Sequence, residues 1–232
     1  MEVVRFLVIS NADINKASNN GCTPLYIASQ NGHIQVVQCL VSSNADVNMA
    51  DNGGFTPLCI ASLKGHLEVV RFLVISNADI NMADNTGCTP LMIASQHGHL
   101  EVVRFLIKSN ADINKANDNG TPPLMVASQE GHLKVVQLLV KSNADINYDD
   151  TNGLTSLMVA CNNGHLEIVN LLLRNHAEVN KVAQSGRTSL HIACHSGHLD
   201  VVMTLIDAKA NLFLKDVDGD TPLDYATTDE IR

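Results

Sequence analysis

The dipeptide Gly-His recurs six times along this chain, at a constant interval of 33 residues. The same interval separates seven leucines, from Leu25 to Leu223, and seven alanines, from Ala28 to Ala226. A unit of this size is too small to bury enough surface on its own. The period therefore predicts a repeat protein, in which each unit is stabilised by packing against its neighbours. The six pairs are Gly32-His33, Gly65-His66, Gly98-His99, Gly131-His132, Gly164-His165 and Gly197-His198.

Local signals within one unit predict two short helices and a turn. Thr56-Pro57 is typical of a helix start, because the Thr oxygen accepts backbone hydrogen bonds and Pro at the first position sacrifices none. Gly65 ends this helix, and Asn77 ends a second one in the left-handed conformation that Asn tolerates. The second helix, His66 to Val74, is expected to bury Val69, Val70, Leu73 and Val74 and to expose Glu68 and Arg71. Ala-Asp-Ile-Asn and the next Asp-Asn-x-Gly then form a hairpin-like turn.

The segment from Gly54 to Val70, with Gly54-Phe55-Thr56-Pro57-Leu58 at its start, followed by Asn77-Ala78-Asp79-Ile80-Asn81, resembles the ankyrin-repeat signature. The resemblance covers nearly the whole chain. It implies an α-helical solenoid: a stack of antiparallel helix pairs with hairpin-like loops, whose concave groove is made by the hairpins and first helices. We expect one domain over 1–232, with partial repeats at 1–17 and 216–232 and full repeats at 18–50, 51–83, 84–116, 117–149, 150–182 and 183–215.

Several positions depart from the repeat pattern. Ser156 and Ser189 replace the helix-starting Pro, and Pro122 stands where the capping Thr belongs. A missing cap costs about 1 kcal/mol, so we expect a locally unstable segment at 119–124. Residues 1–10 repeat 67–76 except for Met1, which predicts that the chain begins inside a second helix, as a fragment of a longer array would. Asn211, Phe213 and the acidic residues from Asp216 to Glu230 resemble a C-terminal cap.

Composition limits the class of partner and the compartment. The net charge of -9 and the pI near 5.4 argue against nucleic acid and anionic membrane surfaces as ligands, and favour a basic or neutral partner. No signal peptide stands at the start, and no apolar stretch approaches the roughly 20 residues of a membrane span. The six cysteines form no CxxC pair, which suggests a reducing compartment. We therefore expect an intracellular, cytoplasmic protein with no direct membrane insertion.

Residues with the chemistry of a functional site also have structural explanations in this sequence. His191, Cys194, His195 and His198 have the spacing of soft metal ligands on one side of a helix, but His191, Cys194 and His198 also occupy repeat positions, which favours scaffolding. The Gly-His histidines could act as a pH-sensitive ladder, but their periodicity favours the same structural role. The asparagines from Asn15 to Asn180 resemble sites of asparaginyl hydroxylation, and we favour turn residues instead. No phosphate-binding, hydrolase or metalloprotease motif is present. We predict no enzyme, no catalytic residue, no metal and no cofactor.

Positions that vary between units within the constant scaffold are the expected partner-binding surface. They lie at the hairpin tips and first-helix ends, and comprise Asn20, Cys22, Gln30, Asn31, Asn52, Phe55, Leu63, Lys64, Thr86, Cys88, Gln96, His97, Asn119, Gln129, Glu130, Asn152, Leu154, Asn162, Asn163, Ser185, Arg187 and His195. Phe55 is either an apolar anchor for a partner or packs on the neighbouring hairpin.

Two functions follow from this surface. The first is a non-catalytic adaptor or scaffold module that binds a partner protein or peptide along the hairpins and first helices. The alternative is an architectural or self-associating array, whose partners are more of the same chain or a larger parent protein. A saturable partner favours the first function, and concentration-dependent self-association or elastic unfolding in unit-sized steps favours the second.

Overall fold

The computed structural model of the protein describes residues 12–226. This range holds twelve α-helices, one 3-10 helix and no β-strand beyond an isolated bridge between Asp149 and Thr155. The chain forms two compact units, 1–118 and 119–232. The helix expected within residues 1–10 and the acidic residues Asp229 and Glu230 lie outside the described range. One domain with the repeat boundaries given above stays a prediction.

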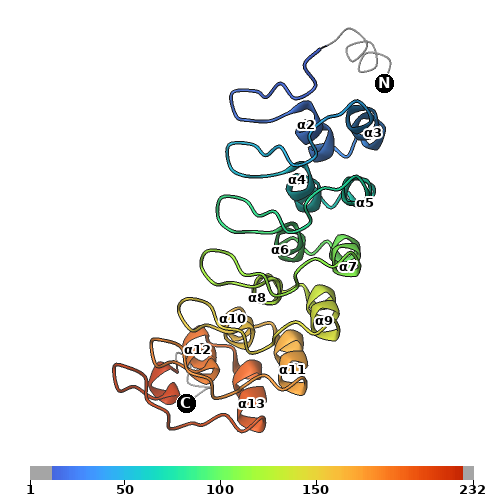
Figure 1. Ribbon diagram of the computed structural model, residues 1–232. Helices are drawn as coiled ribbons and strands as arrows, with labels where there is room; N and C mark the ends of the chain where they lie inside the picture. Colours follow the sequence, from blue (N-terminus) through green and yellow to red (C-terminus); the bar gives the residue numbers. More distant parts are fainter. Residues whose placement is uncertain (1–11, 227–232) are drawn as a thin grey trace. The chain divides into compact units, whose positions relative to one another are not determined.

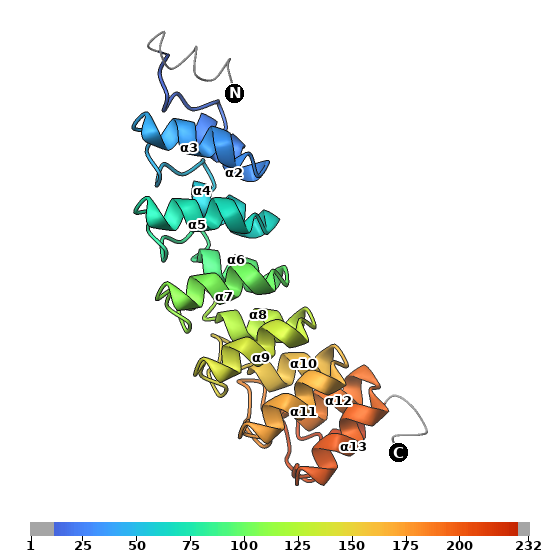
Figure 2. The same ribbon diagram turned by 90° about the vertical axis from the view of Figure 1, so that its right-hand side faces the viewer.

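The first unit contains three helix pairs. They are α2 (Pro24–Gln30) with α3 (Ile34–Ser42), α4 (Pro57–Lys64) with α5 (Leu67–Ile75), and α6 (Pro90–Gln96) with α7 (Leu100–Lys108). Each first helix packs on the next first helix, and each second helix on the next second helix. Figure 1 shows the hairpin loops of this unit projecting from the side of the first helices, and Figure 2 shows α3, α5 and α7 side by side.

The second unit repeats this arrangement. Its pairs are α8 (Pro123–Gln129) with α9 (Leu133–Lys141), α10 (Ser156–Asn162) with α11 (Leu166–Arg174), and α12 (Ser189–Ser196) with α13 (Leu199–Asp207). The short 3-10 helix η1 (Pro222–Tyr225) packs on α12 at the position of a further first helix.

Capping threonines start the first helices, as predicted. Thr56 Oγ1 accepts a hydrogen bond from the Cys59 N–H at 3.1 Å, and Thr155 Oγ1 accepts one from the Met158 N–H at 3.3 Å. Pro122 occupies the cap position of α8 and provides no side-chain hydrogen bond there. The missing cap is therefore confirmed, and the low local stability expected from it stays a prediction.

Left-handed residues end both helices of a unit, also as predicted. Gly65 has a φ of 72° at the end of α4, and Asn77 has a φ of 67° just after α5. The register of Asn77 is occupied in the last two repeats by His176 and Lys209, whose φ angles are also positive. These two residues hold a backbone conformation that their side chains disfavour.

The core is built from the predicted apolar positions. Val69, Val70 and Leu73 of α5 are buried, and Glu68 and Arg71 are exposed. Val74 is half-buried rather than fully inward, as are its counterparts Val41 and Ile107.

Two sets of hydrogen bonds join consecutive repeats. The Nε2 atoms of His66, His99, His165 and His198 lie 2.9–3.2 Å from the carbonyl oxygens of Gln30, Leu63, Gln129 and Asn162, at the ends of the preceding first helices. In the hairpins, the Oδ1 atoms of Asn15, Asn48, Asn81, Asn147 and Asn180 accept backbone N–H groups 31 residues further on. The structural roles predicted for these histidines and asparagines are confirmed.

Candidate functional site

The predicted partner-binding residues all reach the surface. Seven are half-buried: Cys22, Gln30, Phe55, Leu63, Cys88, Leu154 and Arg187. The others are exposed: Asn20, Asn31, Asn52, Lys64, Thr86, Gln96, His97, Asn119, Gln129, Glu130, Asn152, Asn162, Asn163, Ser185 and His195. The two proposed roles of Phe55 both stay open, because a half-buried ring is compatible with either.

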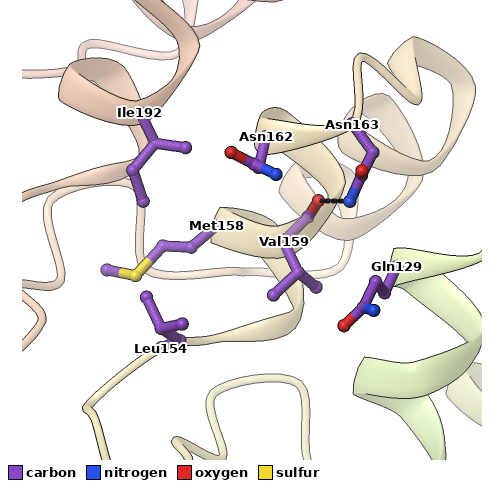
Figure 3. A pocket seen from close by; sticks show the side chains of 7 residues that line it. All are labelled: Gln129, Leu154, Met158, Val159, Asn162, Asn163 and Ile192. Atoms are coloured by element: carbon purple, nitrogen blue, oxygen red, sulfur yellow. Dashed lines mark hydrogen bonds between the residues drawn. The ribbon is translucent and has the colours of Figure 1, made fainter. Parts of the chain in front are cut away.

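Four of these residues meet at one pocket of the second unit. This pocket is a hollow of about 360 Å³ lined by Gln129 at the end of α8, Leu154 from the hairpin before α10, and Asn162 and Asn163 at the end of α10. Met158 and Val159 of α10 and Ile192 of α12 complete its wall. Figure 3 shows Leu154, Met158, Val159 and Ile192 as its apolar part, with the three amide side chains along one side of them.

The lining combines aliphatic and amide groups without a charged side chain. Met158 is fully buried, whereas Leu154, Val159 and Ile192 are half-buried and present apolar surface to the hollow. A pocket with apolar walls and a few polar groups is the usual form of a ligand-binding site. This hollow therefore offers apolar contact and hydrogen bonds at one place.

Intramolecular hydrogen bonds orient the amide side chains. Asn163 Nδ2 donates to the Val159 carbonyl at 2.9 Å, the bond drawn in Figure 3, and Asn162 Oδ1 accepts from Ser196 Oγ at 3.2 Å. Gln129 Nε2 donates to Glu130 Oε1 at 3.4 Å. Asn163 Oδ1 and Asn162 Nδ2 make no hydrogen bond to another described residue, and so have capacity for a ligand.

Met158, Val159 and Ile192 were not predicted from the sequence. They occupy helix positions that are apolar in other repeats too, and Ile60 and Ile93, at the register of Val159, are almost fully buried. Helical spacing could have indicated Val159 as a pocket residue, because it lies three residues before Asn162 and shares its helix face.

Arg187 is held within its own unit instead of joining this pocket. Its Nη2 donates to Tyr225 Oη at 2.7 Å, and its guanidinium lies 4.4 Å from the centre of the Tyr225 ring. Tyr225 Oη in turn donates to Asp216 Oδ2 at 2.6 Å. This hydrogen bond, with backbone N–H donors from Asp220 and Asp218, lowers the pKa of Asp216 to about 2. The contacts attach η1 to the hairpin and helix of the preceding repeat.

The residues with metal-ligand spacing make contacts within the protein, and the rings of His191 and His195 both pack against Tyr225. His191 Nδ1 accepts the Thr188 N–H at 3.1 Å, and the ring of His195 packs edge-on against Tyr225. Burial raises the pKa of Cys194 to about 11, which disfavours the thiolate that binds metals. Across residues 12–226, no cluster of three or more His, Cys, Asp or Glu side chains has the arrangement of a metal site.

The family model for ankyrin repeats, built from three repeat copies, matches residues 1–84, 73–150 and 157–231. The chain belongs to the ankyrin-repeat family. Among solved structures it is similar to the ankyrin repeat domain of Bcl-3, described as a unique member of the IkappaB protein family. That match has 33% identity and a TM-score of 0.81, over 92% of this chain and 97% of the other. The human ASB11 ankyrin repeat domain has 27% identity and a TM-score of 0.83, over 90% and 93% of the two chains.

A search of curated protein sequences gave no match. The predicted fold class, an ankyrin-type all-helical solenoid, is confirmed by the helix pairs and by these structures. Ankyrin repeat domains generally mediate protein–protein interactions, using the extended surface that stacked repeats create. Within the described residues, the helices are too short or too polar to span a bilayer.

Proposed function

We propose that this ankyrin-repeat chain is a non-catalytic adaptor that binds a partner protein or peptide through its hairpin tips and first-helix ends. The observation that carries the proposal is the pocket beside α10, where four of the residues selected from repeat variation lie together. Variable residues on a constant scaffold are where specificity is expected, because the scaffold positions are needed for packing.

The chemistry of this surface suggests how a partner is bound. Most candidate residues are polar and uncharged, so they supply hydrogen bonds more than charge pairing. The net charge of -9 supports a basic or neutral partner, because the summed field of the chain attracts positive charge during association.

Affinity capture from the source cell, with the 232-residue chain as bait, tests the proposal. The groove variant combines Gln30→Ala, Gln96→Ala and Gln129→Ala at first-helix ends. The matched control combines Gln35→Ala, Glu101→Ala and Lys134→Ala, exposed on second helices. We expect a saturable partner that the groove variant loses and the control retains. Equal capture by both variants would contradict the proposal.

Exposed apolar side chains near the C-terminal end of the second unit favour a second candidate function, self-association. Phe213 is 81% exposed and Val217 is 70% exposed. Sedimentation velocity over a range of concentrations distinguishes the two, because an adaptor sediments as one species and a self-associating array shifts to larger species.

A further inference from the structure

We propose that the pocket beside α10 accepts one uncharged aliphatic side chain, that of leucine, isoleucine or methionine, from an extended segment of a partner protein. The amides of Gln129, Asn162 and Asn163 bind the peptide groups on either side of that residue. This proposal rests on the proposed function and specifies the chemistry of the ligand at one repeat.

The walls of the pocket fit an aliphatic group. Leu154, Val159 and Ile192 come from a hairpin and two helices, and each exposes part of an aliphatic side chain to the same hollow. A volume of about 360 Å³ is at the small end of ligand pockets, so it suits one or two side chains better than a cofactor. Transferring an aliphatic side chain from water to such walls is favourable because it removes apolar surface from water.

The uncharged wall of the pocket disfavours insertion of a charged side chain from the partner. Among residues 12–226, no Lys, Arg, Asp or Glu lines the pocket. An inserted ammonium or carboxylate would lose hydration against a wall that offers it no group of opposite charge, which is costly, although Glu130 lies next to Gln129 at the rim. The wall therefore favours a neutral inserted group.

The amide rim complements an extended backbone. A peptide in extended conformation presents both N–H donors and C=O acceptors, and primary amides supply both kinds of group. Asn162 Nδ2 and Asn163 Oδ1 provide one donor and one acceptor without a partner among the described residues.

The backbone that carries two of the rim residues is held in place by the following repeats. The carbonyl oxygens of Gln129 and Asn162 lie 2.9 and 3.2 Å from the Nε2 atoms of His165 and His198, which join the helix ends to the following repeats. A site held in place before binding loses less conformational entropy when the ligand arrives.

This combination occurs in one repeat. The register of Leu154 holds Cys22, Phe55, Cys88, Thr121 and Arg187 in the other full repeats, and the register of Asn162-Asn163 holds no second Asn-Asn pair. The specificity is therefore expected to belong to repeat 150–182 rather than to the scaffold.

Two substitutions borrow residues that other repeats carry at the same register, and so should preserve the fold. Leu154→Thr copies Thr121 and removes an apolar wall, and Asn162→Leu copies Leu63 and removes an amide. Gln35→Leu is the matched control, because it also replaces an amide with leucine, at an exposed position of α3 outside the predicted partner-binding surface. Circular dichroism and thermal melting establish that each variant is folded.

The probe is a random dodecapeptide library displayed on phage and selected against the intact chain. We expect the selected peptides to share one Leu, Ile or Met. A synthetic peptide from the selection should shift the methyl NMR signals of Met158 and Ile192. Leu154→Thr and Asn162→Leu should each weaken its binding about tenfold or more, whereas Gln35→Leu should not.

Three results would overturn the pocket assignment: no peptides are selected, the selected peptides share no aliphatic residue, or Leu154→Thr binds the peptide with unchanged affinity. Concentration-dependent shifts of the Met158 methyl without peptide would instead show that a second copy of the chain occupies the pocket, and would overturn it as well. If the groove variant loses its captured partner while Leu154→Thr retains it, the adaptor function stands and the pocket assignment fails. If neither variant loses the partner, the adaptor function itself fails.

Discussion

Lys209 and His176 stand where the earlier repeats have asparagine, and they keep the same left-handed backbone, with φ angles of 67° and 68°. The turn geometry is therefore imposed by helix packing on either side and not by the residue itself. Side chains other than Gly, Asn and Asp disfavour this region because Cβ approaches the following carbonyl oxygen.

Lys209→Asn should raise the free energy of unfolding of the chain by about 0.5–1 kcal/mol, because asparagine tolerates this backbone conformation. Urea titration followed by circular dichroism measures the change. Lys209→Ala serves as the control, since alanine removes the side-chain charge without relieving the backbone. A gain in stability equal for both variants would contradict the explanation.

Ser156 is a second residue whose replacement should stabilise the protein. It is fully buried at the first position of α10, and its hydroxyl has no hydrogen-bond partner within the described part of the chain. Thr155 before it is extended, as a residue preceding Pro must be. Ser156→Pro should raise stability by restricting the unfolded chain, by less than the usual ~0.5–1 kcal/mol, because the ring also removes the Ser156 N–H beside the bridge between Asp149 and Thr155. Thermal melting tests this, with Ser156→Ala separating the loss of the hydroxyl from the effect of the ring.

The first helices differ in how the free backbone N–H groups at their starts are hydrogen-bonded. Helix α8 lacks the threonine cap seen at α4 and α10, while α12 uses the His191 ring to accept the Thr188 N–H. The same helix position therefore has different local stability in different repeats.

Pro122→Thr should supply the missing cap of α8 and stabilise it by about 1 kcal/mol. Amide hydrogen exchange at 119–124 should slow relative to the unchanged protein. Thr89→Ala is the reciprocal variant, which should remove a working cap from α6 and speed exchange there. Exchange rates at α8 that do not respond to Pro122→Thr would show that the cap does not limit its stability.

The attachment of η1 should depend on acid. The pKa of Asp216 is about 2 in the folded protein and about 3.9 in an unfolded chain, so its carboxylate stabilises the fold above about pH 4. This stabilisation should be lost as pH falls from about 4 towards 2. Thermal melts across that range should show a smaller decline for Asp216→Asn than for the unchanged protein. Tyr225→Phe removes the main hydrogen bond and should move the pKa of Asp216 upwards.

At the level of the complete chain, exposed apolar surface is unevenly distributed. Met203, Phe213, Val217 and Leu223 are each more than half exposed, and Phe213 and Leu223 line an apolar pocket of about 280 Å³ in the second unit. Solvent-exposed apolar surface of this kind binds hydrophobic dyes and promotes association.

Phe213→Asn should reduce the fluorescence of bound anilinonaphthalene sulfonate without lowering the melting temperature. Asparagine fits the position, because Asn48, Asn81 and Asn180 occupy it in other repeats. Ile75→Asn, at an isolated residue that is 76% exposed in the first unit, is the control and should change dye binding less. Equal effects of both substitutions would show that the dye does not report on the C-terminal surface.

Much of the protein could be predicted from spacing along the chain. Short sequence patterns were enough to predict the 33-residue period, the Thr-Pro helix starts and the glycine and asparagine helix ends. They also predicted the burial of Val69, Val70 and Leu73. These features depend on interactions over a few residues. Stacking could be predicted too, because a unit of this size is unstable alone.

The pocket and the attachment of η1 could not be predicted in this way. Val159 and Ile192 have the same apolar character as buried residues in other repeats, and their half-exposed state depends on the neighbouring helices and on Leu154 of the hairpin. Arg187 meets Tyr225 across 38 residues and Asp216 across 29. Such contacts arise only when distant segments pack together, because no periodic pattern in one dimension specifies which side chains converge in space.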